Sequence, residues 1–334
     1  MSAVAEILED VRARGDDAVR DWSLRFDGVE PARATPGDEL PEEAVLALAD
    51  RVRRWHALQR PADVRLEVEP GVELERRWVP LKSVGIYVPR SLVSTLVMCA
   101  VPAQTAGVER IVVTTPPAGA QLIAAAARLL GIDEVWAVGG PQAIAALAYV
   151  HRVDKIVGPG NAYVNEAKLL VSRDVAIDLP AGPSEVVVVL GRGADFEIAQ
   201  LELAAQAEHG ADAVCELVDG DDLEQALAEV ERRAPEHVVL LGDADVLAGR
   251  IRNAGAVFVG ESSPVATGDY ATGGNHVLPT GGWARSTGGL GLETFLKPVT
   301  VQRLTADGLE RMRPTVEALA AVEGMTAHAL AVAR

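Results

Sequence analysis

The chain has 334 residues, a length that provides a full hydrophobic core and about two domains. Apolar residues make up 49% and charged residues 24%, which is the composition of a globular protein, and the formal net charge of −17 argues against nucleic-acid or anionic-membrane partners. No apolar run reaches the roughly 18–20 residues that span a bilayer, and the acidic, amphipathic residues 1–19 are neither a signal nor a transit peptide, so we expect a cytoplasmic protein.

Residues 1–82 are expected to form a helical N-terminal segment that leads into the first of two lobes. Proline and glycine interrupt the helical pattern over residues 30–43. Further on, the segment 69–81 opens with the turn signal Pro70-Gly71 and continues as a short β segment. We therefore expect this segment to lead into the first sheet.

The first lobe is placed at residues 83–184, where β-rich runs alternate with helical patterns. Such alternation is typical of parallel βα units in an open sheet. Helices are expected to end at Gly107 and Gly131, because glycine is common just after a helix C-terminus. The expected strands cover residues 83–88, 110–115, 134–140 and 155–161, and the expected helices cover 92–107, 121–131, 141–150 and 163–171.

The alternation repeats over residues 185–291, which we assign to a second lobe hinged to the first near Gly182-Pro183. The predicted fold class is therefore α/β, with two related lobes built on open, mostly parallel sheets and with helical segments at both ends of the chain. The expected strands cover residues 185–191, 213–218, 237–242 and 256–260, and the expected helices cover 196–210, 222–234 and 245–255.

The periodicity stops after Gly260, where a long, polar, glycine-rich loop begins. Long loops inside domains are commonly functional, and the His, Asp, Tyr and Asn content of this one favours that interpretation. Residues 292–334 are expected to form a helical C-terminal tail. Cys99 and Cys215 each lie inside an apolar run and are expected to be core residues rather than nucleophiles.

Six histidines are the first candidates for chemistry. Two of them, His56 and His151, lie among arginine and lysine residues and are expected to be solvated. The other four each lie near a carboxylate or an amide, in the sequences QAEH, PEH, GGNH and EGMTAH. These four are His209, His237, His276 and His328.

Gln206 and His209 are three residues apart near the end of an expected helix, so their side chains would point the same way. Imidazole nitrogen and carboxylate oxygen are zinc ligands, and an amide oxygen serves less often. Asp269 in the glycine-rich loop and His328 in the tail could complete such a site. From the spacing alone, an ordinary polar helix end is the favoured interpretation.

Glu236 and His237 stand at the start of an expected strand, at the edge of the second sheet. A histidine with a pKa near neutrality is a natural general base, and a neighbouring carboxylate can hold a water molecule. A turn or capping pair is the competing interpretation.

Two glycine turns, VGGPQAI and GPGNAYV, each join a strand to a helix. Backbone N–H groups at helix N-termini suit an anionic group, although plain turn chemistry explains both sequences equally well. Neither turn has the six-position glycine fingerprint of a dinucleotide site.

Together these motifs resemble the L-histidinol dehydrogenase family over most of the chain. The matching stretches include VRARGDDAVRDWSLRFDGV, SVGIYVP, GGPQAIAALAY, VDKIVGPGNAYVNEAK, AIDLPAGPSEVVVV, QAEHGADA, PEHVVL, NAGAVFVG, GDYATGGNHVLPT and EGMTAH. The resemblance implies two incomplete Rossmann-like lobes and a homodimer with a shared active site and one Zn²⁺ per site. It also implies oxidation of an amino alcohol to an amino acid in two NAD-dependent steps, through an enzyme-held aldehyde.

The resemblance also implies roles for individual residues. It assigns NAD contacts to the first lobe and the metal and acid–base residues mainly to the second. The implied zinc ligands, which also contact the substrate, are Gln206, His209, Asp269 and His328. The implied acid–base pair is Glu236 and His237, and the further substrate contacts are Ser184, His276 and Glu323. The implied NAD contacts are Tyr87, Gln142 and Asn161.

This chain departs from the family pattern in several places. It is shorter than a typical member and lacks an N-terminal extension, its loop after Pro89 is cut to RSLVST, and a segment is missing between Gly210 and Asp222. The tail continues for only six residues after His328. Two alternatives therefore stay open: a related dehydrogenase acting on another polar alcohol, and a non-catalytic metal-binding relative with weakened NAD binding.

Overall fold

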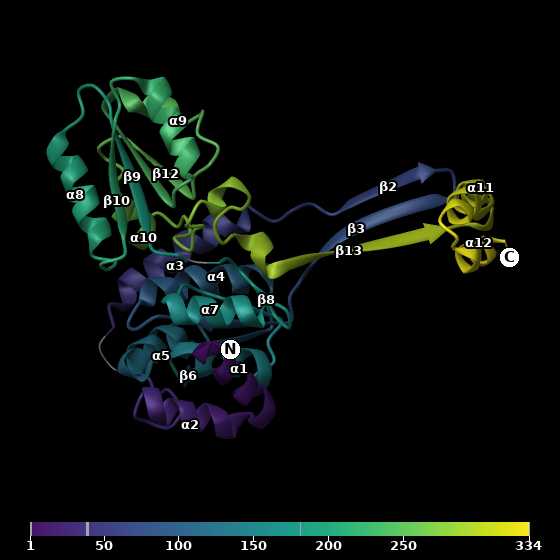
Figure 1. The fold of residues 1–334 in the computed structure, drawn as a ribbon, viewed down its shortest axis with the longest axis horizontal. Coiled ribbons are helices and arrows are strands. Elements are labelled where there is room, and N and C mark those ends of the chain that lie inside the picture. Colours follow the sequence, from purple (N-terminus) through teal and green to yellow (C-terminus); the bar gives the residue numbers. More distant parts are fainter. Residues whose placement is uncertain (1, 38–39, 181, 334) are drawn as a thin grey trace. The chain divides into compact units, whose positions relative to one another are not determined.

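The structure is a computed structural model that describes residues 2–37, 40–180 and 182–333. It divides the chain into two units, one made of Met1–Gln59 and Leu81–Phe295 and the other of Arg60–Pro80 and Leu296–Arg334. The larger unit contains two separate sheets, and the smaller unit contains a third (Figure 1). Each unit is described by itself.

The first sheet of the larger unit has the strand order β1-β6-β5-β4-β7-β8 and is parallel except at its β1 edge. Every residue of β4 is buried, as expected for a central strand covered on both faces. This confirms the expected parallel βα architecture. The strands are β1 (Ala32–Arg33), β4 (Ser83–Tyr87), β5 (Arg110–Thr115), β6 (Val135–Ala137), β7 (Lys155–Val157) and β8 (Ala176–Ile177).

Helices cover both faces of this sheet, and the N-terminal helices contribute to both layers (Figure 1). Apolar residues of α1, such as Val4 and Leu8, pack with α6 and α7 in one core. Apolar residues of α3, such as Val45 and Val52, pack with α4 in another. The helices are α1 (Ala3–Arg14), α2 (Asp16–Phe26), α3 (Glu42–Ala57), α4 (Val93–Ala106), α5 (Ala120–Leu129), α6 (Gly140–Ala145) and α7 (Ala162–Val171).

The second sheet of the larger unit is fully parallel, with the order β10-β9-β11-β12. The central strands β9 and β11 carry runs of buried valine and leucine, which explains why they form without an alternating pattern. The elements are β9 (Glu185–Leu190), α8 (Phe196–Ala207), β10 (Val214–Asp219), α9 (Leu223–Arg233), β11 (His237–Leu241), β12 (Ala256–Val259) and the short α10 (Val265–Tyr270).

The prediction of a helix over residues 245–255 is wrong. A short 3₁₀ helix, Gly242–Leu247, follows β11, and the chain then runs irregularly to β12. The Glu231 carboxylate accepts hydrogen bonds from the N–H groups of Arg252 (2.6 Å) and Asn253 (3.3 Å), so these amides have a side-chain partner instead of a helical one.

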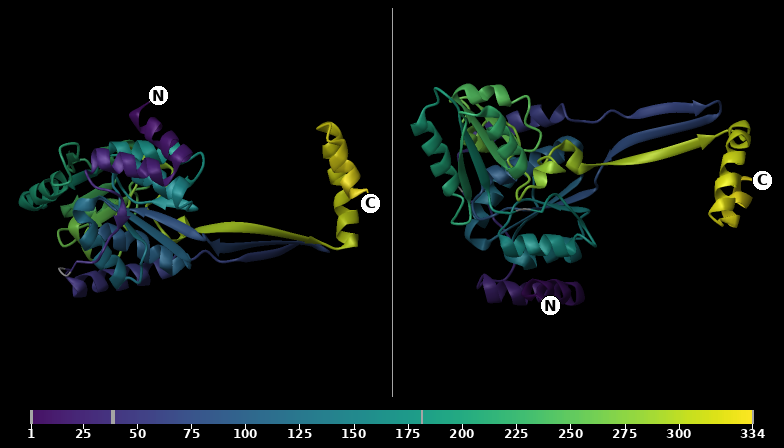
Figure 2. Two further views of the ribbon diagram at one scale, coloured as in Figure 1. Left: turned by 90° about the horizontal axis from the view of Figure 1, so that it is seen from below. Right: turned by 45° about the horizontal axis from the view of Figure 1, so that its top comes forward.

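The smaller unit holds an antiparallel sheet of order β13-β3-β2, built from β2 (Val64–Glu69), β3 (Val72–Pro80) and β13 (Leu296–Leu304) (Figure 1 and Figure 2). The β segment expected after Pro70-Gly71 is β3, which belongs to this sheet and not to the first one. The tail expected to be helical from residue 292 starts with a short 3₁₀ helix, Leu292–Phe295, continues as β13, and only then forms α11 (Ala306–Val322) and α12 (Thr326–Val332). The division into segments at residues 82, 184 and 291 stays a prediction.

Within the described ranges, no helix is both long and apolar enough to cross a membrane. The two cysteines are free: Cys99 is buried, as expected, and Cys215 is only partly buried.

A buried ion pair fixes the turn after β7. Lys168 Nζ lies 2.5 Å from Asp178 Oδ1, and each side chain is 2% exposed. The same ammonium donates to the Gly158 carbonyl oxygen at 2.8 Å, and the Gly158 N–H donates to Asp178 Oδ2 at 2.7 Å. The pair therefore holds both polar groups of Gly158.

We expect Asp178→Asn to lower the free energy of unfolding by about 3–5 kcal/mol, because it leaves the Lys168 charge buried and uncompensated. Glu30→Gln is the matched control, since Glu30 and its partner Arg20 are 59% and 57% exposed and such a pair contributes no more than about 1 kcal/mol. Urea unfolding of both variants tests this. Equally small decreases in the free energy of unfolding of both variants would show that the buried pair does not stabilise the fold.

Candidate active site

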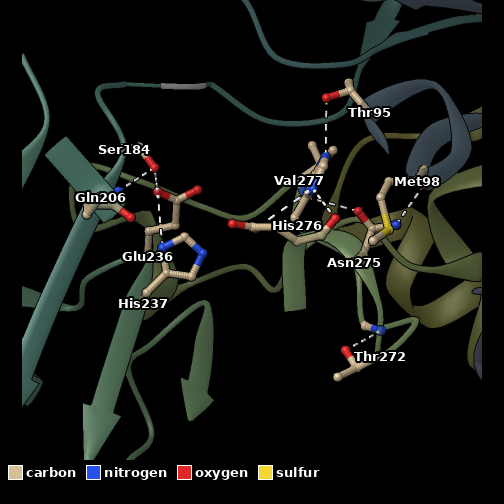
Figure 3. Close-up of polar contacts among 12 residues, drawn as sticks. Thr95, Met98, Ser184, Gln206, Glu236, His237, Thr272, Asn275, His276 and Val277 are labelled. Atoms are coloured by element: carbon tan, nitrogen blue, oxygen red, sulfur yellow. Dashed lines mark hydrogen bonds and ion pairs between the residues drawn. The ribbon is translucent and has the colours of Figure 1, made fainter. Parts of the chain in front are cut away.

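Glu236 and His237 lie where β11 begins, beside the first residues of β9. Both are buried, with 6% and 3% of their surface exposed. Ser184 immediately precedes β9 and Gln206 lies near the end of α8, and both side chains reach the same place (Figure 3). The structure therefore brings together four of the residues that the sequence singled out.

The Glu236 carboxylate is held by a short chain of hydrogen bonds. Ser184 Oγ donates to Glu236 Oε2 at 2.6 Å, and the Glu185 N–H donates to the same oxygen at 2.9 Å. Gln206 Nε2 in turn donates to Ser184 Oγ at 2.7 Å. Burial raises the pKa of Glu236 to about 7, against the opposing effect of these hydrogen bonds. This carboxyl group can therefore exchange a proton near neutral pH.

The His237 ring has a defined tautomer. Its Nδ1 lies 3.0 Å from the carbonyl oxygen of Glu185, which can only accept a hydrogen bond, so Nδ1 carries the proton. Burial lowers the pKa of His237. The ring is consequently neutral at physiological pH, with an unprotonated Nε2 that can take a proton from another molecule.

Asp269, in α10, and His209, just after α8, lie near this pair. Burial raises the pKa of Asp269, and His237 and His209 oppose this only when their rings are protonated. The N–H of His209 donates to the Gln206 carbonyl oxygen at 3.1 Å, so these two residues remain on one turn although α8 ends at Ala207. The helix thus ends slightly before the expected stop at Gly210.

The described residues contain no group of three or more His, Cys, Asp or Glu side chains that could hold a metal ion. His209 and Asp269 could supply two ligands of that kind, and Gln206 could add an amide oxygen. The Gln206 nitrogen donates to Ser184, so its oxygen is the atom with ligand character. A nitrogen, a carboxylate and an amide oxygen form a donor set that fits zinc once a further ligand is added.

His276 connects the glycine-rich loop to α4 in the first lobe. Thr95 Oγ1 lies 3.2 Å from His276 Nε2 (Figure 3). His276 Nδ1 lies 3.2 Å from the carbonyl oxygen of Asp269. Burial lowers the pKa of His276 to about 4, so the ring is neutral. The neighbouring Asn275 donates to the Met98 carbonyl oxygen at 2.7 Å, which further fixes the loop.

The remaining two predicted substrate and metal residues belong to the smaller unit. Glu323 caps the C-terminus of α11, and His328 lies in α12. Both are exposed in the structure, as is His209 in the larger unit.

The predicted NAD residues lie along the first sheet. Tyr87 ends β4, Gln142 lies in α6, and both are buried. Asp27 Oδ2 accepts hydrogen bonds from the Gly139 N–H at 3.4 Å and from Gln142 Nε2 at 3.2 Å. The first glycine turn thus already has a carboxylate partner from its own chain.

The second turn shows ordinary capping chemistry as well. Asn161 Oδ1 accepts the Val164 N–H at 3.1 Å and so caps α7. Two buried oxygens nearby, Gln142 Oε1 and Asn165 Oδ1, have no hydrogen-bond partner among the described residues. Buried acceptors of this kind suit the hydroxyl or amide donors of a cofactor, so these residues fit NAD better than the turn amides do.

Two expectations about histidines need correction. His56 is buried rather than solvated, because it continues the apolar face of α3 four residues after Val52, to whose carbonyl oxygen its Nδ1 lies 2.8 Å. His151 is half-buried, with its ring 5.2 Å from that of Trp136. The helical period of α3 could have identified the first; the second depends on tertiary packing.

Sequence reasoning missed three residues that support the site: Asp27, Thr95 and Glu185. Each acts through a partner at least 51 positions away in the chain, so no local pattern signals it.

Comparison with known proteins gives a consistent picture. The sequence profile of the family described as histidinol dehydrogenase matches residues 1–222 and 216–334. The histidinol dehydrogenase of Methanosarcina mazei is 39% identical over 98% of this chain and 89% of its own length. That of Methanothermobacter thermautotrophicus is 40% identical over 98% of this chain and 92% of its own length.

The alignment with the Methanosarcina mazei protein runs over 388 positions, more than the 334 residues of this chain, so that relative has internal segments that this chain lacks. Among solved structures, the histidinol dehydrogenase of Elizabethkingia anophelis has a TM-score of 0.91 and 32% identity over 99% of this chain and 90% of its own. The succinate-semialdehyde dehydrogenase of Burkholderia pseudomallei, at TM-score 0.55 and 13% identity, covers 90% of this chain and 84% of its own and shares the fold alone.

Proposed function

This chain belongs to the histidinol dehydrogenase family, and from that premise we propose that it oxidises L-histidinol to L-histidine in two NAD-dependent steps through an enzyme-held aldehyde. The observation that carries this proposal is the buried Glu236–His237 pair, in which one group is a neutral base and the other a carboxyl group with a pKa of about 7. Bound NAD⁺ would supply the hydride acceptor for each step.

His237 is the base for the alcohol step. Its Nε2 takes the hydroxyl proton while the hydride leaves the carbinol carbon, so the alcohol becomes an aldehyde. The Glu185 carbonyl oxygen keeps Nδ1 protonated and therefore keeps Nε2 available throughout.

Glu236 is the base for the aldehyde step. As a carboxylate it takes a proton from a water molecule that adds to the aldehyde carbon, and the resulting hydrate, formed as its alkoxide, loses the second hydride to give the carboxylic acid. Ser184 holds Glu236 Oε2 for this role while Oε1 is the oxygen that can face water.

Zinc would be held by Gln206, His209 and Asp269, with His328 supplied by a second copy of the chain in a homodimer. The partly buried Asp269 carboxylate, whose charge is disfavoured by desolvation, fits a site that receives a cation. Bound zinc supplies positioning of the amine and imidazole nitrogens of the substrate. Glu323 of the second copy and His276 would contact the same substrate, and NAD would contact Tyr87, Gln142 and Asn161.

Steady-state formation of NADH from L-histidinol tests the proposal. We expect turnover by the zinc-loaded protein, loss of turnover after treatment with a chelator, and recovery on adding Zn²⁺. Absence of NADH formation by protein shown to contain zinc would contradict the proposed function, whereas full turnover by protein shown to be metal-free would contradict only the role of zinc.

The pKa of Glu236 predicts a pH profile. Because the carboxylate form is needed and the pKa is raised to about 7, the rate of oxidation of the aldehyde histidinal should fall about tenfold per pH unit below pH 7 and level off above it. Initial rates between pH 5 and 9 measure this. A rate that falls only near the ordinary glutamate pKa would contradict the role of Glu236 as the base.

A related dehydrogenase acting on another polar alcohol is the competing function. The acidic Glu323 favours an aminated substrate and disfavours a sulfonated one by like charge. A panel of alcohols compared by kcat/KM separates the two. The non-catalytic alternative predicts no thermal stabilisation by millimolar NAD⁺, whereas NAD⁺ at about 100 times its Kd should stabilise a binding protein by about 2.7 kcal/mol.

A further inference from the structure

Glu185, the first residue of β9, makes four hydrogen bonds around the acid–base pair. Its main-chain N–H donates to Glu236 Oε2 at 2.9 Å, and its carbonyl oxygen accepts from His237 Nδ1 at 3.0 Å. Its carboxylate accepts the Glu236 N–H at 3.2 Å through Oε2 and the Gly281 N–H at 3.0 Å through Oε1. One residue thus contacts both catalytic groups and the loop that follows His276.

The position of Glu236 explains why this side chain matters. The ladder between β9 and β11 begins with the pair Val186 and His237, so Glu236 lies one residue before it. Among the described residues its N–H has no strand partner, and it is held by the Glu185 carboxylate instead. The side chain therefore extends the ordered part of β11 to include the residue whose carboxyl group does the chemistry.

The second oxygen of Glu185 anchors a different segment. Gly281 lies five residues after His276 in the glycine-rich loop, and the preceding Thr280 accepts the Gly182 N–H through Oγ1 at 2.5 Å. The Glu185 carboxylate therefore links the start of β9, the start of β11 and this loop. A carboxylate that accepts two backbone N–H groups is a strong, charge-assisted anchor.

We propose that Glu185 is a positioning residue that fixes the Glu236 main chain relative to His237 and the glycine-rich loop for both oxidation steps. This inference rests on the proposed function. The Glu185 side chain would act on the turnover rate and not on the affinity for substrate or NAD⁺, because its contacts are to the main-chain N–H groups of Glu236 and Gly281. Small displacements of catalytic groups can lower a rate by about a hundredfold.

The test compares Glu185→Ala and the more conservative Glu185→Gln with the matched control Glu231→Ala. Glu231 lies in α9 of the same lobe, and its carboxylate also accepts two main-chain N–H groups, those of Arg252 and Asn253, outside the site. Amide hydrogen exchange reports directly whether each carboxylate protects its two amides. Steady-state kinetics with L-histidinol and NAD⁺ give kcat and both KM values for each variant.

We expect faster exchange at Glu236 and Gly281 in Glu185→Ala only, and at Arg252 and Asn253 in Glu231→Ala only. We also expect kcat to fall between about tenfold and a hundredfold in Glu185→Ala, less in Glu185→Gln, and by less than twofold in Glu231→Ala, with both KM values little changed.

Two results would overturn the inference: unchanged exchange at Glu236 and Gly281, or faster exchange there without a loss of kcat. If Glu185→Ala does not fold, Glu185→Gln provides the same comparison. Inactive but zinc-loaded wild-type protein would refute the proposed function itself, and the exchange pattern would still show whether Glu185 holds these two amides.

Discussion

Replacing His237 with Asn should lower kcat for L-histidinol oxidation by about 10²–10⁴-fold, the usual contribution of a general base. The structure gives the reason, because the Glu185 carbonyl oxygen fixes the proton on His237 Nδ1 and burial keeps the ring neutral. Asparagine cannot take a proton from the substrate hydroxyl. Stopped-flow and steady-state measurements of NADH formation with saturating L-histidinol check this result.

Substitutions of Glu236 and His237 should have separable effects. His237→Asn should slow the alcohol step most, whereas Glu236→Gln should slow oxidation of histidinal most, because only a carboxylate at position 236 can activate water. His151→Asn is the control, because His151 takes no part in the site. This residue is half-buried, and its Nδ1 lies 3.7 Å from Glu134 Oε1. Equal losses of both steps in both variants would contradict separate roles.

Removing the tail should abolish metal binding and activity together. A chain ending at Leu304 keeps β13 but loses α11 and α12, and with them Glu323 and His328. If His328 completes the zinc site of a second copy, the shortened protein should lose its zinc, as measured by metal analysis after dialysis. Retention of zinc at full affinity would contradict the shared site.

A mixing experiment distinguishes a shared site from one built within a single chain. His209→Ala and His328→Ala variants should each be inactive alone. In mixed dimers with a shared site, one of the two sites recovers all its ligands, so random mixing should restore about a quarter of the wild-type activity. No recovery from protein shown to exchange subunits would place all ligands in one chain.

The sequence predicts the strand–helix order of both lobes well, because buried parallel strands read as continuous apolar runs bounded by glycine. It predicts the acid–base pair as a candidate for the same reason: Glu236 and His237 directly precede such a run. It does not predict β13, because the partner of that strand, β3, lies more than 200 positions earlier in the chain. Non-local pairing of this kind leaves no periodic signal beyond the strand itself.

For the glycine turns, the local sequence indicates a site that the tertiary structure does not leave free. Their sequences suggest an anion site, but Asp27 and Asp178, which lie outside these turns in the chain, already accept hydrogen bonds from Gly139 and Gly158. The local sequence predicts that N–H donors are present in a turn, but it does not predict which groups accept their hydrogen bonds. The roles of Tyr87, Gln142 and Asn161 toward NAD stay predictions for the same reason.

The stoichiometry of NADH formation tests the central claim most directly. With limiting L-histidinol, excess NAD⁺ and zinc-loaded protein, a site that uses His237 for the alcohol and Glu236 for the aldehyde should form two NADH and one L-histidine per L-histidinol, without release of free aldehyde. One NADH per L-histidinol with accumulation of histidinal, or no NADH at all, would contradict the account.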